Sequence, residues 1–326
     1  MTDAPDPARI WQDAALAGAL AAVDPFGLGG VALRARHGPV REAWLAGVRA
    51  LLPEGTPLRR VPPHVGDDRL LGGLDLAATL SAGRAVASRG LLAEADGGFV
   101  LLPMAERAED RLVGRLAGTL DNGVLRAERD GLSLALPART GVIALDEGES
   151  ADEGLAEALA DRLAFRVDLG GVSHRDTAPF PVSAADVAAA RGRLATVAPD
   201  PEAEAALCTT AMGCAIRSLR APILALRAMR AVQALYAGAL GPTEAAEIAA
   251  RLVLAPRATS LPPPPPDEED AETEDSPPES PPESEETESA GEVEELSDRV
   301  LEATRAALPP ELLASLAEGA SAPRPA

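Results

Sequence analysis

Short apolar segments that alternate with helical patterns are the feature that most constrains the fold of the first half of this chain. Apolar runs predict strands at 29–35, 57–61, 99–102, 141–145 and 165–169. Helices are expected at 8–23, 43–53 and 152–160, one from about Asp75 and one ending at Asn122 and Gly123, with a hairpin turn at Asp130 and Gly131. This alternation predicts an α/β fold, with a parallel sheet covered by helices on both faces.

A second region, 183–256, has helical patterns alone. Ser183 followed three residues later by Asp186 is typical of a helix N-terminus, and three more apolar-periodic segments follow. We therefore expect an α/β core at 1–182 and a separate small helical domain at 183–256.

The composition changes again at Arg257, where a Pro-rich and acidic segment begins. Residues 257–326 hold 19 acidic and 4 basic residues, which is most of the net charge of −21. Such a segment buries too little apolar surface to offset its ordering entropy, so we expect a disordered linker at 257–296 and a helix at 297–318. The linker is either a solvated spacer or a docking segment for a basic partner or for magnesium, and a further domain is expected beyond it.

Charge and hydropathy exclude several classes of protein. All 30 basic residues are arginine, and they form no basic patch of the kind that binds nucleic acid. No apolar run approaches the roughly 18–20 residues that cross a bilayer, so we expect a cytoplasmic protein without a transmembrane segment. Cys208 and Cys214 are expected to be buried thiols, and no metal site of the chain's own is predicted.

The loop between the first predicted strand and its helix stands where a phosphate-binding loop, G-x-x-x-x-G-K-[ST], would lie. In ARHGPVRE, Ala35 and Val40 occupy the two glycine positions, although Gly38 remains between them. Arg41 replaces the lysine that reaches phosphate, and Glu42 replaces the hydroxyl that holds magnesium. This loop is either a weak anion site at a helix N-terminus or a solvated turn.

A second nucleotide element is also altered. The apolar strand 99–102 is followed by Pro103 and Met104, where an ATPase has Asp and Glu. A chain that keeps the scaffold but loses both chemical elements is predicted to be a degenerate ATPase module.

Several spaced segments resemble one known family. DRLLGGLD at 68–75 and RGLLAEADGG at 89–98 are similar to the ATPase region of magnesium chelatase. With the altered nucleotide motifs and the acidic linker, the chain resembles the D subunits of the bacteriochlorophyll-type enzyme. The resemblance implies an AAA+ fold, an α/β core with a helical lid, followed by an integrin-type domain whose D-x-S-x-S motif this chain lacks.

The resemblance also implies site residues. Arg162, beside Asp161, matches the family's arginine finger, and Arg220 matches the sensor arginine of the lid; both would act on the ATP of a neighbouring subunit. Gly38 and Arg41 would be what remains of the chain's own nucleotide site. The alternative is that both Arg162 and Arg220 make ordinary surface ion pairs.

The function implied is that of a non-catalytic subunit of an ATP-dependent ligase that forms a metal–nitrogen bond. It would form a ring with the ATP-hydrolysing subunit, which binds most of the ATP and Mg²⁺. That ring would drive insertion of magnesium into protoporphyrin IX on a porphyrin-binding subunit. Two alternatives are a MoxR-like AAA+ protein that remodels or metallates another partner, and an α/β scaffold without energy coupling.

Overall fold

The computed structural model describes residues 6–129, 132–150, 152–260 and 286–306, and it divides into two compact units. The α/β unit comprises Asp3–Val197 together with Arg230–Ala239. The helical unit comprises Ala198–Met229 and the chain from Leu240 onward. Each unit is described by itself below.

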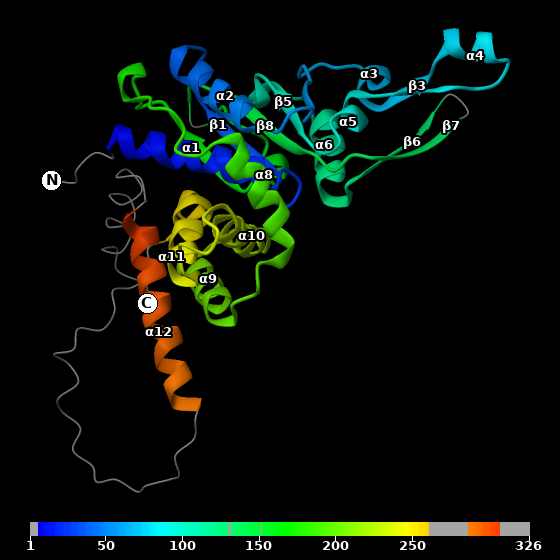
Figure 1. Cartoon of the computed structure of the whole chain (residues 1–326). Coiled ribbons are helices and arrows are strands. Elements are labelled where there is room, and N and C mark those ends of the chain that lie inside the picture. The colour runs from blue at the N-terminus through cyan, green and yellow to red at the C-terminus, as the bar shows by residue number, and fades with distance from the viewer. Residues whose placement is uncertain (1–5, 130–131, 151, 261–285, 307–326) are drawn as a thin grey trace, which may run out of the picture. The chain divides into compact units, whose positions relative to one another are not determined.

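A five-stranded sheet in the order β2-β5-β8-β1-β9 forms the centre of the α/β unit (Figure 1). Every neighbouring pair of strands is parallel, as predicted. The five expected strands are confirmed to within one residue at each end. Their bounds are β1 Gly30–Arg34, β2 Leu58–Arg60, β5 Phe99–Leu102, β8 Gly141–Asp146 and β9 Phe165–Asp168.

Helices pack against both faces of this sheet because alternate strand residues point to opposite sides. Val100, Leu102, Val142 and Ala144 lie in one buried cluster with side chains of α3, α5 and α6. Helices α1 and α2 pack together elsewhere in the unit, where the buried Trp44 donates its Nε1–H to Ala14 O at 2.8 Å. The helices of the unit are α1 Pro7–Val23, α2 Pro39–Leu51, α3 Asp67–Leu71, α5 Leu91–Glu94, α6 Asp110–Asn122, α7 Glu157–Ala160 and α8 Ala184–Arg193.

Two antiparallel hairpins extend from the sheet toward the same side (Figure 1). Strands β6 (Val124–Arg129) and β7 (Leu132–Pro137) form the predicted hairpin, although its turn at Asp130 and Gly131 lies outside the described residues. Strands β3 (Gly72–Leu74) and β4 (Ala87–Arg89) form a second hairpin around helix α4 (Leu76–Ala82). This second hairpin has no signal in the sequence, because its strands are three residues long and lack apolar alternation.

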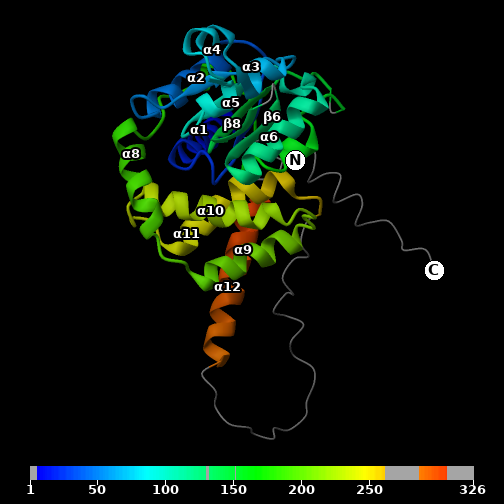
Figure 2. The same ribbon diagram turned by 90° about the vertical axis from the view of Figure 1, so that its right-hand side faces the viewer.

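The helical unit contains α9 (Pro201–Gly213), α11 (Pro242–Ala249) and α12 (Glu286–Ala306), with α12 packed along α9 and α11 (Figure 2). Helix α10 (Arg220–Leu235) is divided between the two units after Met229. No helix within the described ranges is long and apolar enough to cross a bilayer.

The expected boundary at Ser183 differs from the one observed. Ser183 and Asp186 do form the predicted capping box, which also lowers the pKa of the Asp186 carboxyl through hydrogen bonds from Ser183. Helix α8 nevertheless packs on α1 and α2, and Arg191 donates to Ala22 O at 2.8 Å. The division between the units therefore follows Val197.

The linker expected at 257–296 is not observed at either of its two ends. Arg257 is buried, and the backbone N–H groups of Thr259 and Ser260 donate to Cys214 O at 3.0 and 3.3 Å. Helix α12 begins at Glu286, so residues 286–296 are helical rather than disordered. The remainder of the expected linker, 261–285, lies outside the described residues, and so does the part of the 297–318 helix that follows Ala306.

The two cysteines differ, contrary to the expectation that both are buried. Cys214 is buried in a cluster with Ala255 and Ala258, and this burial raises the pKa of its thiol to about 11. Cys208 is exposed on α9.

We predict that one thiol per native chain reacts with a thiol reagent at pH 8. A thiol with a pKa near 11 is almost fully protonated at pH 8, and the thiolate is the reactive form. Cys214 should therefore react only after unfolding. Reagent titration with and without denaturant measures this. Cys208→Ser should abolish the native reaction, and a native reaction that survives the substitution would contradict the assignment.

Candidate functional site

The carboxyl ends of the parallel strands meet at one edge of the sheet, which is where ligands bind in open α/β folds. Arg34 ends the central strand β1 and lies in register between Asp146 of β8 and Asp168 of β9. Helix α2 begins at Pro39, four residues earlier than predicted, since proline suits the first turn of a helix. This edge and the loop before α2 form the candidate site.

Gly38 is the residue that precedes α2. Its φ of 167° and ψ of −179° are extended, and no side chain caps the helix there. A Cβ added at Gly38 would meet nothing within 4 Å. The structure therefore places Gly38 directly before α2, in a conformation that any residue can adopt, and its part in a phosphate loop stays a prediction.

Arg41 is buried, with 5% of its surface exposed, and its guanidinium contacts a carboxylate of the chain itself. Its Nη1 lies 2.6 Å from Glu147 Oε1, in the loop that follows β8. Its Nε lies 3.7 Å from Glu42 Oε1 and makes no hydrogen bond. Arg41, at the position of the phosphate-loop lysine, is thus paired with Glu147. Its role in binding a nucleotide stays a prediction.

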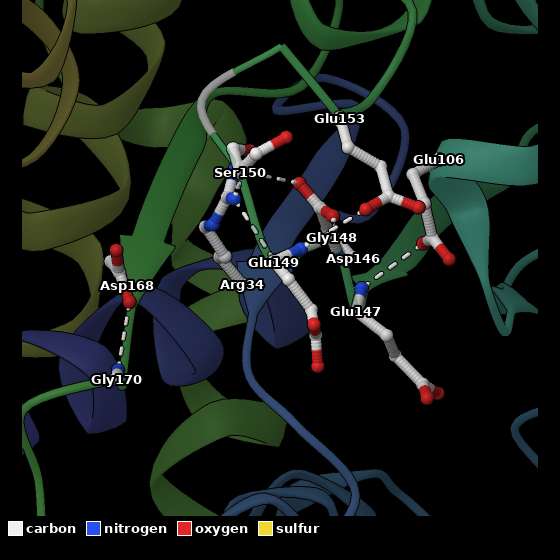
Figure 3. Close-up of polar contacts among 10 residues, drawn as sticks. All are labelled: Arg34, Glu106, Asp146, Glu147, Gly148, Glu149, Ser150, Glu153, Asp168 and Gly170. Carbon is white, nitrogen blue, oxygen red and sulfur yellow. Dashed lines mark hydrogen bonds and ion pairs between the residues drawn. The ribbon is translucent and has the colours of Figure 1, made fainter.

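The described residues of 146–153, which are 146–150 and 152–153, are named here the β8 loop, and they run from the end of β8 toward α7, the observed part of the helix expected at 152–160. Arg34 holds this loop by donating Nη2 to Gly148 O at 2.9 Å and to Ser150 O at 2.7 Å (Figure 3). The carboxylate of Asp146 accepts the N–H of Gly148 at 2.8 Å and lies 3.6 Å from Arg34 Nη1. Helix α7 begins only at Glu157, five residues later than predicted.

A buried carboxylate supports the β8 loop from the neighbouring strand. Glu106 follows β5, and its side chain is 1% exposed. Its Oε2 accepts the N–H of Glu147 at 3.0 Å (Figure 3), and its Oε1 lies 3.4 Å from Arg107 Nε. Both oxygens of Glu106 are therefore engaged within the chain.

The residues at this edge do not fit a bound nucleotide with magnesium. Pro103 and Met104 follow β5 and offer no carboxylate, while the arginine in the lysine position is paired with Glu147. In the part of the chain that the structure describes, no group of three or more His, Cys, Asp or Glu side chains could hold a metal ion.

Arg162 lies after α7 in a bidentate ion pair with α6. Its Nε and Nη2 lie 3.0 and 2.6 Å from the two carboxylate oxygens of Asp121, and its Nη1 donates to Ala158 O at 2.6 Å. Gly29, with a φ of 69°, packs so closely that an added Cβ would lie 2.0 Å from Arg162 O. Arg162 is therefore fixed in position by both its side chain and its backbone.

Arg220 is the first residue of α10 and is exposed in the helical unit. Its backbone N–H donates to Ser218 Oγ at 3.1 Å. The structure brings Gly38 and Arg41 together, whereas Arg162 lies at a different part of the α/β unit and Arg220 in the other unit. The roles of Arg162 and Arg220 stay predictions.

Arg34, Glu106 and Glu147 are not among the site residues predicted from the sequence. One signal was present: DEGESADE at 146–153 places five carboxylates directly after a predicted strand, at the edge where the arginine-bearing loop lies. Glu106 gave no such signal, because its burial depends on the packing of the turn after β5.

The strand order and the helix after β1 define a P-loop-type parallel α/β core, followed along the chain by a helical region. A solved structure of a candidate ATPase from Cytophaga hutchinsonii has this fold, with a TM-score of 0.53 at 15% identity over 72% of this chain and 78% of that one. At this identity the likeness shows the fold alone.

Sequence comparison adds two named relatives. The chain is 42% identical to a magnesium-chelatase 60 kDa subunit of Cereibacter sphaeroides, over 97% of this chain and 53% of that protein. It is 30% identical to a magnesium-chelatase 38 kDa subunit of Rhodobacter capsulatus, over 51% of this chain and 55% of that protein. The chain thus spans about half the length of the curated relatives it matches. No family model matches the sequence.

We predict that the Arg41–Glu147 pair stabilises the α/β unit. Arg41→Met leaves Glu147 without its partner and should lower the free energy of unfolding by about 1–3 kcal/mol. Adding Glu147→Ala removes the unpaired charge, so the double variant should lose less than the sum of the single changes. Tryptophan fluorescence during urea unfolding reports this, since Trp11 and Trp44 both lie in the α/β unit.

The matched control is Arg36→Met. Arg36 also pairs with the β8 loop, at 3.6 Å from Glu149, but 79% of its side chain is exposed, so little stability should be lost. Additive effects of Arg41→Met and Glu147→Ala would contradict a coupled pair.

Proposed function

We propose that this chain is the AAA+ part of a 60 kDa-type magnesium chelatase subunit and that it does not hydrolyse ATP. The observation that carries the proposal is the 42% identity to such a subunit along 97% of the chain. The geometry supports the absence of hydrolysis, because Arg41 is paired with Glu147, and Pro103 and Met104 stand directly after β5 at the positions where an ATPase has its metal-handling carboxylates.

The role proposed for the chain is structural coupling. It would assemble in a ring with an ATP-hydrolysing subunit, and this ring would act on a porphyrin-binding subunit in bacteriochlorophyll biosynthesis. Magnesium gives up its water reluctantly, so its insertion into protoporphyrin IX requires work that ATP hydrolysis in the partner would supply. ATP and Mg²⁺ would be bound mainly by that partner.

The chain's own contribution to hydrolysis would be arginines presented to its neighbour. Arg162 is pre-positioned by Asp121 and is 19% exposed, and an arginine at a neighbour's γ-phosphate stabilises charge in the transition state. Arg220 is proposed as a second contributor because it is exposed at the start of α10.

We predict no measurable ATP hydrolysis by the purified chain, because the residues that orient phosphate and metal are replaced. A phosphate-release assay at saturating ATP and Mg²⁺ measures this. Turnover above background that disappears in Arg41→Ala would overturn the proposal that this subunit is non-hydrolysing. Co-purification with a 38 kDa-type ATPase subunit, with and without ATP, tests the partnership, and its absence would favour a different AAA+ role.

We predict that Arg162→Ala lowers ATP hydrolysis by the reconstituted partner by at least about tenfold, since such arginines contribute several orders of magnitude. Asp121→Asn is the matched control. It removes the charge that pairs with Arg162 but leaves the arginine in place. It should therefore lose the same ion pair as Arg162→Ala but reduce the ATP hydrolysis of the partner much less. Equal loss in both variants would assign Arg162 a structural role, and co-purification would show that assembly is retained.

A further inference from the structure

Three arginines of one short segment all contact the β8 loop. Arg34 binds the carbonyl oxygens of Gly148 and Ser150, and Arg36 lies 3.6 Å from Glu149. Arg41 makes the shortest ion pair of the three, at 2.6 Å to Glu147. The positive charge of this segment therefore faces the β8 loop of the same chain.

We propose that Glu147 is an internal ligand that masks a residual polyphosphate site at the start of α2. A carboxylate and a phosphate offer arginine the same kind of anionic oxygen acceptor. Glu147 supplies that acceptor at the residue whose place in the loop is the one that reaches phosphate. Removing the carboxylate exposes an anion site formed by Arg41 and the first turn of α2.

The hydrogen bonding of Arg41 supports this assignment. Its side chain is 6% exposed, yet Nε has no hydrogen-bond partner and faces Glu42 only at 3.7 Å. A single carboxylate oxygen thus leaves a buried donor unsatisfied, which is costly. A ligand with several oxygens, such as a polyphosphate, satisfies more of the guanidinium than Glu147 does.

The β8 loop does not depend on Glu147 for its place. Arg34 anchors it through two carbonyl oxygens, and Glu106 binds the backbone N–H of Glu147 rather than its side chain. Truncating Glu147 therefore removes the competing charge without dismantling the loop. The inference goes beyond the proposed function, because it concerns the chain's own ligand and is tested without any partner.

The test is calorimetric titration of the full chain with inorganic tripolyphosphate, without magnesium because Pro103 and Met104 offer the metal no carboxylate. Glu147→Ala should bind at least about tenfold more tightly than the unmodified chain, as expected when one competing charge-assisted hydrogen bond is removed. Adding Arg41→Met to Glu147→Ala should reverse the gain.

Glu42→Ala is the matched control, since it removes the same charge beside the same arginine without vacating the short contact. The affinity of Glu42→Ala for tripolyphosphate should rise less than about threefold. The reason is that Glu42 Oε1 lies 3.7 Å from Arg41 Nε, which is too far for a hydrogen bond. Tryptophan fluorescence verifies folding, and Glu147→Gln replaces Glu147→Ala if the alanine variant does not fold. Three results would overturn the proposal. The unmodified chain and the Glu147 variant could bind tripolyphosphate equally well, or both glutamate variants could gain the same affinity. The third is that the affinity gained by Glu147→Ala survives the addition of Arg41→Met.

Discussion

The candidate site depends on one constraint, which is that a guanidinium cannot give up its charge when it is buried. Arg41 is fixed on α2 by the helix that begins at Pro39, so its partner has to come from the chain around it. Glu147 meets this need at 2.6 Å, and Glu106 in turn fixes the backbone of Glu147. One ion pair and the hydrogen bond that supports it therefore join three segments, which are the turn after β5, the loop after β8 and the helix after β1.

The scaffold of the sheet and the polar residues at its edge are two separate properties of this unit. The parallel sheet, with its order β2-β5-β8-β1-β9, keeps the scaffold of a nucleotide-binding protein. The chemical groups have changed at each element that would handle nucleotide, with Glu42 and Pro103 where magnesium would be held. The scaffold of the sheet and the residues at its carboxyl edge can therefore vary independently.

The fold could be predicted from the sequence further than the site could. The β1, β5 and β8 strands are continuous apolar runs, and such runs mark buried parallel strands regardless of the residues around them. The Arg41–Glu147 pair joins positions 106 residues apart, so no local pattern predicts it. The α8 boundary failed for a similar reason, because a capping box specifies where a helix begins but not the unit on which it packs.

Gly29 brings the backbone of Arg162 against the start of the central strand. Leu28 O accepts the N–H of Ala164 at 2.8 Å at the start of β1, whose far end carries Arg34 and the β8 loop. Any side chain at position 29 would therefore displace the Arg162 carbonyl and disturb the end of β1 opposite the β8 loop, since its Cβ would lie 2.0 Å from that oxygen.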